Sequence, residues 1–241
     1  MLKKFLTHGI LNGIDVENYN PETDKDVFKN YSVDNMRGKA TNKRELQKLL
    51  GLPEKKDTPV MGMVTRLVSH KGLDLCKAVL DELLATTDIQ LVVLGSGDYQ
   101  YEEFFRGLAQ RYPDKVGLCL GFIPDLARKI YAGSDMFLMP SKSEPCGLSQ
   151  MVALRYGSIP IVRETGGLRD SVTDSGDNMG NGFVFSSYNA HDMLHAIKRA
   201  VEGYQDQKGW AILVKRAMES DNSWGKSANE YIKMYKEVLK G

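Results

Sequence analysis

One short stretch of the sequence gathers several groups that could do chemistry. Residues 141–150 read S-K-S-E-P-C-G-L-S-Q, which places the carboxylate of Glu144 two residues before the thiol of Cys146. A cysteine can serve as a nucleophile when a neighbouring base activates it, or as a metal ligand when companion ligands are available. The sequence shows neither beside Cys146. We therefore expect Glu144, and not the thiol, to be the functional group of this stretch.

Two cations follow an earlier apolar run. Arg66 and Lys71 lie five residues apart in T-R-L-V-S-H-K-G, and Gly72 opens a segment with helical spacing. A guanidinium gives a forked contact and an ammonium a point charge, and the free N–H groups of a helix N-terminus add to both. This spacing suits a diphosphate, the alternative being two solvated surface cations.

The elements that must position these residues alternate regularly. Short apolar runs bounded by glycine, proline and charge are typical of buried strands, and they occupy residues 60–65, 90–95, 116–121, 135–140 and 159–163. Segments with helical spacing lie between them, at residues 72–86, 99–112, 125–133 and 147–156. This alternation predicts an α/β fold, a Rossmann-like doubly wound parallel sheet covered on both faces. Ligands of this fold bind beyond the carboxyl ends of the strands, so the residues after each strand are the site candidates.

Other strand ends carry weaker signals. L-G-S-G-D (94–98) matches half of a dinucleotide fingerprint, but Tyr101 stands at the expected third glycine, which favours a simple strand-to-helix turn. Phe122, after the third run, suits either stacking on a base or a place in the core. Gly147 allows a helix to begin close to a ligand, and T-G-G-L (165–168) supplies another turn. Together the strand ends predict a pocket for a phosphorylated, hydroxyl-rich ligand: a nucleotide, a sugar nucleotide or a dinucleotide.

The flanks divide the chain into three expected parts. Residues 1–42 have weak periodicity and are expected to be an interdomain linker or loop, followed by the Rossmann-like domain at 43–222 and a C-terminal helix at 223–241. Further helices are predicted at 190–203 and 208–220, with helical spacing from 223 to 240 in the last part. The loop at 174–182, rich in glycine, asparagine and aspartate, is expected to be mobile.

Composition excludes several classes of partner. The net charge of +1 gives no case for nucleic acid or an anionic membrane, and no apolar run of about 18 residues predicts a membrane span. Three cysteines without C-x-x-C spacing favour a reducing compartment, so we expect a cytoplasmic protein. His191 and His195 lie four residues apart, but no third ligand sits nearby. We expect no metal and no cofactor.

Four motifs together resemble bacterial glycogen synthase and plant starch synthase. They are H-G-I-L-N-G-I-D (8–15), R-L-x-x-x-K-G (66–72), S-x-x-E-P-C-G-L-S-Q (141–150) and T-G-G-L (165–168). The resemblance implies a retaining glucosyltransferase of the GT-B architecture, in which two Rossmann-like domains face each other across a cleft. It also implies ADP-glucose as donor and an α-1,4-glucan, lengthened at its non-reducing end, as acceptor. The compartment would be the bacterial cytoplasm or, in a plant, the plastid stroma.

The same resemblance implies roles for individual residues. Arg66 and Lys71 would hold the diphosphate and neutralise the leaving ADP, and Glu144 would accept hydrogen bonds from glucose hydroxyls. The nucleotide would be contacted by Gly121, Phe122, Ser149 and Gln150. The sugar would be contacted by Asn12, Cys146, Gly147, Leu148, Thr165 and Gly166.

The sequence also departs from the family pattern. Phe122 stands where the family usually has a tyrosine stacked on adenine, and Val152 stands where more distant GT-B families have a second glutamate. The N-terminal domain, with its lysine-glycine-glycine-leucine motif and a histidine over the sugar, has no counterpart in these 241 residues. We therefore expect the C-terminal, donor-binding half of such an enzyme, nearly inactive alone and meeting its acceptor through the missing domain. The alternatives are a GT-B transferase for a UDP- or GDP-sugar, and a dinucleotide-binding module.

Overall fold

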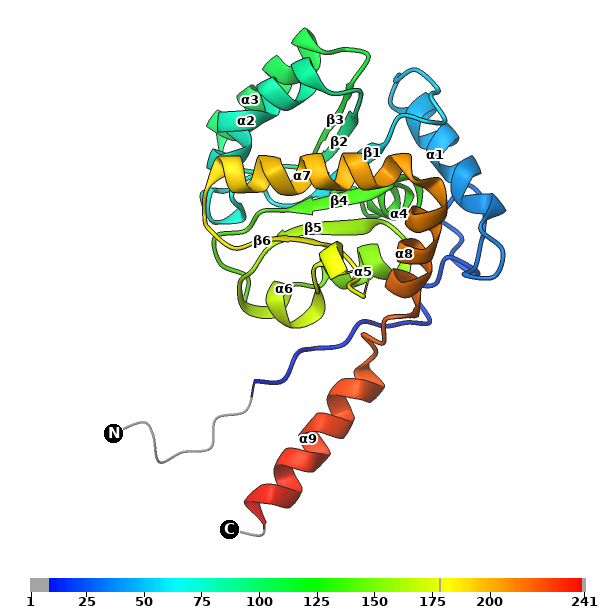
Figure 1. The fold of residues 1–241 in the computed structure, drawn as a ribbon, viewed down its shortest axis with the longest axis vertical. Helices are drawn as coiled ribbons and strands as arrows, with labels where there is room; N and C mark the ends of the chain where they lie inside the picture. Colours follow the sequence, from blue (N-terminus) through cyan, green and yellow to red (C-terminus); the bar gives the residue numbers. More distant parts are fainter. Residues whose placement is uncertain (1–8, 178, 240–241) are drawn as a thin grey trace.

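The computed structural model describes residues 9–177 and 179–239, and the strands within them form one parallel sheet (Figure 1). The strands are β1 (Val60–Val64), β2 (Gln90–Gly95), β3 (Val116–Leu120), β4 (Met136–Met139), β5 (Ile159–Arg163) and β6 (Phe183–Phe185). Their order, β3-β2-β1-β4-β5-β6, is that of the doubly wound Rossmann fold. The predicted fold class is confirmed. Because the winding reverses between β1 and β4, a ligand crevice is expected at the carboxyl ends of these two strands.

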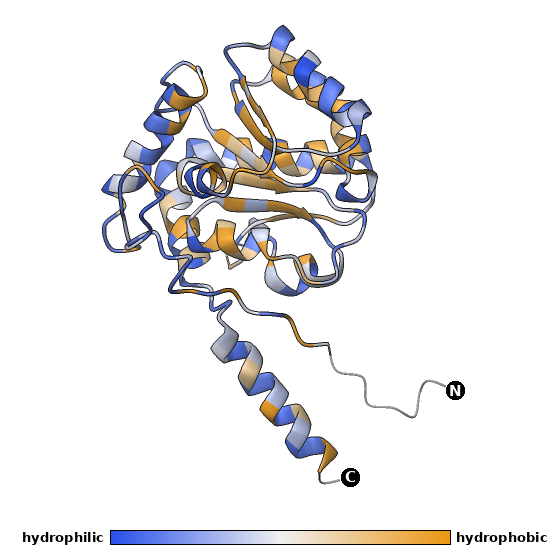
Figure 2. Cartoon of the chain, turned by 180° about the vertical axis from the view of Figure 1, so that it is seen from behind, coloured by the Kyte–Doolittle hydropathy of each residue, from blue (hydrophilic) through white to orange (hydrophobic). Residues whose placement is uncertain are grey.

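Helices cover both faces of this sheet (Figure 1). They are α1 (Arg37–Leu49), α2 (Leu73–Thr86), α3 (Tyr99–Arg111), α4 (Pro124–Gly133), α5 (Ser149–Arg155), α6 (Gly166–Ser171), α7 (Ala190–Gln205), α8 (Gln207–Glu219) and α9 (Trp224–Val238), with short 3-10 turns η2 (Ser69–Lys71) and η3 (Ser175–Asp177). On one face α2 packs between α3 and α7, and on the other α4 packs against α1 and α5. Figure 2 shows the hydrophobic residues concentrated in the strands and on the helix surfaces that face them.

The apolar patterns of the sequence correspond closely to these elements. Each predicted strand is present with its ends shifted by at most a residue or two, and the helical segments from 72 to 156 and from 190 onward are present too. The apolar residues of α2 that share one helical face, Leu73, Cys76, Leu80, Leu83 and Leu84, are all buried. The strand β6, which was not predicted, has only three residues.

The start of the folded unit differs from the expected boundary between residues 42 and 43. Helix α1 begins at Arg37, within the segment expected to be linker, and packs on α4. The amide of Asn42 donates to the carbonyl of Lys29, and its oxygen accepts from the N–H of Phe28 at 2.9 Å. The chain around residues 28–31 is therefore attached to α1. Residues 1–8, with His8 of the first motif, lie outside the described part, as do residues 240–241 and Asn178 of the 174–182 loop.

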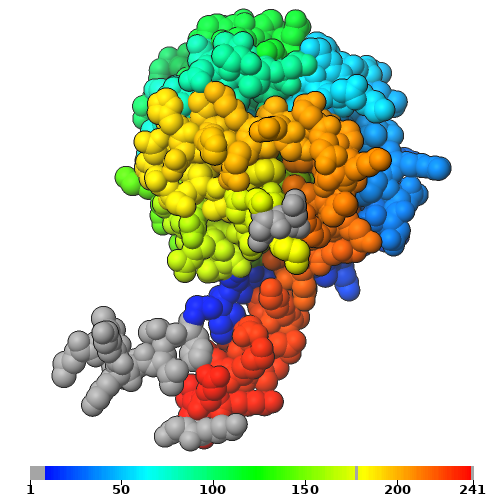
Figure 3. Space-filling view, viewed as in Figure 1, coloured from blue at the N-terminus to red at the C-terminus, as the bar shows by residue number. Residues whose placement is uncertain are grey.

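Helix α9 leaves the body of the domain, as Figures 1 and 3 show. It starts beside the N-terminal segment, where Ile14 forms a parallel bridge with Ser223 and its N–H donates to the carbonyl of Asn222. Gly13 lies so close to the backbone of Trp224 that a β-carbon there would approach its nitrogen to 2.2 Å. The N-terminal segment and the start of α9 thus contact each other at residues 13–14 and 222–224. Among the described residues, no helix is long and apolar enough to cross a membrane.

Candidate functional site

The loops that follow β1 and β4 meet at the switch point of the sheet. The ammonium Nζ of Lys71 lies 2.6 Å from Oε2 of Glu144, and the two side chains are only 17% and 11% exposed. The hydroxyl of Ser141, a buried residue, is 3.3 Å from the same carboxylate oxygen. The topology therefore brings together two of the residues expected to do chemistry, in a setting largely shielded from water.

Backbone contact between the two loops explains this proximity. Gly72 adopts a left-handed φ of +76°, and a β-carbon at this position would lie 2.0 Å from the carbonyl oxygen of Pro140. Nearby, the N–H of Lys142 donates to the carbonyl of His70 at 2.9 Å. Only glycine satisfies both the backbone angle and the close approach at residue 72.

The T-G-G-L turn supports the Glu144 loop from the other side. The N–H of Gly167 donates to the carbonyl of Glu144 at 3.0 Å, and a β-carbon on Gly167 would lie 1.9 Å from the carbonyl oxygen of Cys146. Gly166 has a φ of +45°, and a β-carbon there would lie 2.2 Å from the carbonyl oxygen of Glu144. Thr165 precedes α6 in extended conformation. The predicted sugar-site residues Thr165 and Gly166 thus lie next to Glu144.

Gln150, expected to contact the nucleotide, lies beneath the Glu144 loop. Its side chain is completely buried, and its amide nitrogen lies 3.1 Å and 2.9 Å from the carbonyl oxygens of Cys146 and Gly147. The same nitrogen is 3.0 Å from the hydroxyl of Ser171. The residue has no exposed surface in this structure, and its contact with a nucleotide stays a prediction. The Gln150 side chain supports the loop through these contacts with its main chain.

Cys146 lies in this loop as a half-buried free thiol, while Cys76 is buried in the core. Burial raises the pKa of the Cys76 thiol far above its usual range, so that sulfur remains protonated. Gly147, with a φ of +70°, and the half-exposed Leu148 lead into α5, which begins at Ser149. Within the part of the chain that the structure describes, no cluster of three or more His, Cys, Asp or Glu side chains could hold a metal ion.

Exposed aromatic side chains follow β2 and β3. Phe122 is 90% exposed, which excludes the core alternative and leaves its ring available for stacking. Gly121 precedes it with a φ of +146°, and its N–H donates to the carbonyl of Gly95 at 3.0 Å. Tyr99, the first residue of α3, is 76% exposed and was not among the expected site residues. Its position directly after the L-G-S-G-D turn was the available signal.

That glycine-rich turn packs against the loop after β1. A β-carbon on Gly95 would lie 1.9 Å from the carbonyl oxygen of Thr65, and one on Gly97 would lie 2.4 Å from that of Leu67. The N–H of Asp98 donates to the same Leu67 carbonyl at 2.7 Å. These contacts agree with the strand-to-helix turn that the sequence favoured.

Two other predicted site residues, Arg66 and Asn12, have exposed side chains. Arg66 is exposed, and its Nη2 is 3.5 Å from the Nε2 of His70, so it stands at the surface of the same loop. Asn12 is exposed in the N-terminal segment, whose neighbouring residues Gly13 and Ile14 contact the junction between α8 and α9. Asn12 is therefore an exposed residue next to the segment that contacts this junction, and its contact with the sugar stays a prediction.

Sequence reasoning missed Arg163, the last residue of β5. Its Nε donates to the carbonyl of Ser141 at 3.0 Å and its Nη2 to that of Lys142 at 2.6 Å. An arginine closing a predicted buried strand was the signal that could have found it. It reaches the loop of Glu144 from a neighbouring strand.

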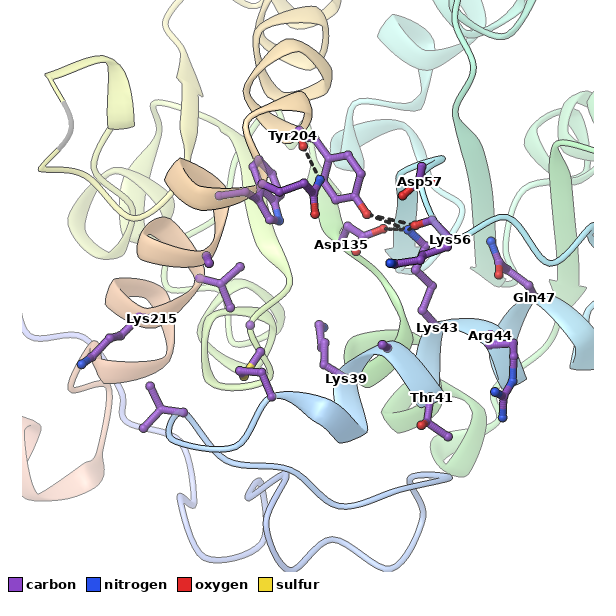
Figure 4. A pocket seen from close by; sticks show the side chains of 18 of the residues that line it. Lys39, Thr41, Lys43, Arg44, Gln47, Lys56, Asp57, Asp135, Tyr204 and Lys215 are labelled. Atoms are coloured by element: carbon purple, nitrogen blue, oxygen red, sulfur yellow. Dashed lines mark hydrogen bonds and ion pairs between the residues drawn. The ribbon is translucent and has the colours of Figure 1, made fainter.

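A cavity of about 660 Å³ lies elsewhere, between α1 and α8 at the opposite edge of the sheet (Figure 4). On its floor the ammonium of Lys43 lies 2.8 Å from both the carboxylate of Asp135 and the hydroxyl of Tyr204. The ammonium of Lys39 contacts the carbonyls of Tyr131, Ser134 and Tyr156. We place the candidate site at the carboxyl edge instead, because ligands of the doubly wound fold bind beyond the carboxyl ends of the strands at the switch point.

Comparison with known proteins identifies the family of the chain. The model of the family described as glycosyl transferases group 1 matches residues 47–216. The glycogen synthase of Bacillus cereus is 54% identical over 233 residues, which are 96% of this chain and 49% of that protein. The glycogen synthase of Desulforamulus reducens is 55% identical over 234 residues, 96% of this chain and 48% of that one. The chain thus spans about half the length of these relatives.

A solved structure shows the same fold. The catalytic domain of starch synthase IV from Arabidopsis thaliana, bound to ADP and acarbose, matches with a TM-score of 0.90 and 40% identity. The match covers 100% of this chain and 50% of that one. The resemblance expected from the four motifs is confirmed, and so is the GT-B fold class.

Proposed function

The chain belongs to the family of group 1 glycosyl transferases, and from this premise we propose that it binds ADP-glucose as the donor domain of a glycogen or starch synthase. The observation that carries the proposal is the Lys71–Glu144 pair at the switch point of the sheet. A cation suited to phosphate and a carboxylate suited to sugar hydroxyls lie side by side, as a nucleotide sugar requires. The ADP bound by the Arabidopsis starch synthase supports adenine as the base.

In this proposal the diphosphate and the glucose meet different groups. Arg66 and Lys71 hold the diphosphate and stabilise the negative charge that develops on ADP as the bond from the anomeric carbon to the phosphate oxygen breaks. Glu144 accepts hydrogen bonds from glucose hydroxyls, and the loop from Cys146 to Leu148 lines the same pocket. Phe122 stacks on the base, and Ser149 faces the phosphate or the ribose.

We also propose transfer with retention, as the resemblance to glycogen and starch synthases implies. A double displacement of the glycosidase kind needs a second carboxylate as nucleophile, and the position eight residues after Glu144 holds the buried Val152. We therefore propose that the acceptor hydroxyl attacks from the face that ADP leaves, and that the departing phosphate takes up its proton. The α-1,4-glucan acceptor would bind through a facing domain, so this chain alone is expected to bind donor but to transfer little glucose.

We also propose limits for the domains. We assign residues 37–222 to the donor-binding domain, residues 9–36 to the approach from the other domain, and α9 to a separate C-terminal element. We also propose a reducing compartment, the bacterial cytoplasm or the plastid stroma, which the three free cysteines support.

Calorimetric titration of the 241-residue chain with ADP, ADP-glucose, UDP, GDP and NADH tests the function. We expect binding of ADP and ADP-glucose and little binding of the others. Tighter binding of UDP or GDP would identify a transferase for a different nucleotide sugar. Binding of NADH in place of ADP-glucose would identify a dinucleotide-binding module and overturn the proposal.

A further inference from the structure

Arg163 joins the rigid end of a central strand to the loop that carries Glu144. Strand β5 pairs with β4 on one side and with β6 on the other, where Arg163 is in register with Phe185. From this fixed position the guanidinium donates to two consecutive carbonyls, those of Ser141 and Lys142. The position of the loop main chain just after β4 therefore depends on this side chain.

Tyr188, in the connection between β6 and α7, packs its ring against the guanidinium of Arg163. The Cζ atom of Arg163 lies 5.5 Å from the centre of the Tyr188 ring, and the Nζ atom of Lys142 lies at the same distance. The Tyr188 hydroxyl donates to Oδ1 of Asp74 at 2.5 Å, in the first turn of α2. Burial, together with the neighbouring Asp74 carboxylate, raises the pKa of the Tyr188 hydroxyl above its usual range, so it remains a donor near neutral pH.

These contacts, together with those between the loops after β1 and β4, surround the Lys71–Glu144 pair. Asp74 follows Lys71 by three residues, and the N–H of Lys142 donates to the carbonyl of His70. Ser141, whose carbonyl Arg163 holds, places its own hydroxyl 3.3 Å from the Glu144 carboxylate. In the contacts of the described residues, Arg163 reaches Glu144 only through the loop main chain.

We propose that Arg163, held in place by Tyr188, is a positioning residue that sets the Ser141–Glu144 loop so that the carboxylate faces the glucose end of the donor. The inference rests on the proposed function for its ligand, and on the hydrogen bonds for its mechanism. A general role in fold stability would affect every ligand alike, whereas a positioning role affects only what Glu144 binds.

Amide hydrogen exchange of the unliganded chain tests the mechanism without any ligand. In Arg163→Met we expect the Lys142 amide to exchange about tenfold faster, because two hydrogen bonds to its loop are lost. Amides of β1 and β2 should exchange as in the wild type. Arg169→Met is the matched control, since Arg169 is exposed on α6 beside Asp170. Unchanged exchange at Lys142 in Arg163→Met, or equal acceleration in the control, would overturn the inference.

Titration with ADP and with ADP-glucose then tests the consequence. We expect the Kd of Arg163→Met for ADP to stay within about twofold of the wild-type value. The ratio of the Kd for ADP to the Kd for ADP-glucose, which measures the contribution of glucose, should fall about tenfold. Arg163→Lys, which keeps one donor, and Tyr188→Phe, which loses only the bond to Asp74, should fall between wild type and Arg163→Met. Equal losses for both ligands would overturn the positioning role. If the wild type bound neither ligand, the proposed function would fail, while the exchange result would still decide whether Arg163 positions the loop.

Discussion

Lys71 donates to Glu144 at 2.6 Å across a sequence separation of 73 residues, which joins the loop after β1 to the loop after β4. An ammonium carries three N–H donors, so Lys71 can keep this contact and still face a phosphate. One cation would then link the diphosphate and glucose halves of a donor. Because both side chains are largely buried, neither can lose its partner without cost.

Replacing Lys71 should weaken nucleotide binding most. In Lys71→Ala we expect the Kd for ADP to rise by roughly ten- to a hundredfold, since a charge-assisted hydrogen bond is lost and Glu144 is left unpaired. Calorimetric titration measures this directly. Lys77→Ala, on the exposed side of the neighbouring helix α2, is the control and should bind ADP as the wild type does. An unchanged Kd for ADP in Lys71→Ala would show that Lys71 does not bind the phosphate.

Glu144 and Cys146 should differ sharply in their effects. In the enzyme reconstituted with its facing domain, we expect Glu144→Ala to reduce glucose transfer by a hundredfold or more, on the order of 3 kcal/mol in transition-state stabilisation. Cys146→Ser should lower donor affinity only a fewfold, because the sulfur lines the pocket without reacting. Steady-state kinetics of both variants decide the matter. A near-total loss of glucose transfer in both variants would show that the thiol takes part in the reaction.

The exposed ring of Phe122 offers a test of base stacking. Stacking of an aromatic side chain on a base contributes roughly 1–3 kcal/mol, so Phe122→Ala should weaken ADP binding about tenfold or more. Phe122→Tyr should retain binding. Because the ring is 90% exposed, neither change should lower the Tm. Equal ADP affinities in all three proteins would show that the base lies elsewhere.

A methyl group at residue 167 should displace the Glu144 loop. In Gly167→Ala the new β-carbon would lie 1.9 Å from the Cys146 carbonyl oxygen, so the backbone must shift at a cost of about 1–3 kcal/mol. We expect a lower Tm and loss of the glucose contribution to donor affinity. Gly107→Ala on the surface of α3 is the control and should be neutral or stabilising. A Gly167→Ala protein with wild-type Tm and donor affinity would contradict the close packing.

The buried ammonium of Lys39 predicts a pH dependence of stability. Burial lowers the pKa of Lys39 to about 7, whereas an unfolded lysine titrates near 10.5. Between these values the unfolded chain binds more protons, so Lys39 contributes a stability that rises with pH, by up to about 1.4 kcal/mol per pH unit. Denaturant unfolding of wild type and Lys39→Met from pH 7 to 10 should show this difference in slope. Parallel curves would mean that the three carbonyls around the ammonium keep it charged.

The amino-acid pattern predicted most of the fold because apolar periodicity is a local property. Strands β1 to β5 and the helices between them bury their apolar residues, and the alternation alone predicts parallel pairing. Helix α1 escaped prediction because its buried positions include Asn42, Lys43 and Gln47, so it has no apolar stripe. Strand β6 escaped because three residues are too short to show a period.

Three of the four motifs likewise lie directly after strands, as expected, since strand ends can be read from the sequence. Which of them meet was decided by the tertiary structure. The strand order brings the loop of Lys71 to that of Glu144, Gln150 is buried beneath that loop, and the segment next to Asn12 pairs with Ser223. The hydrogen bonds from Arg163 to the Glu144 loop also depend on the tertiary structure, because they require β5 to lie next to β4. No local pattern in the sequence encodes that choice.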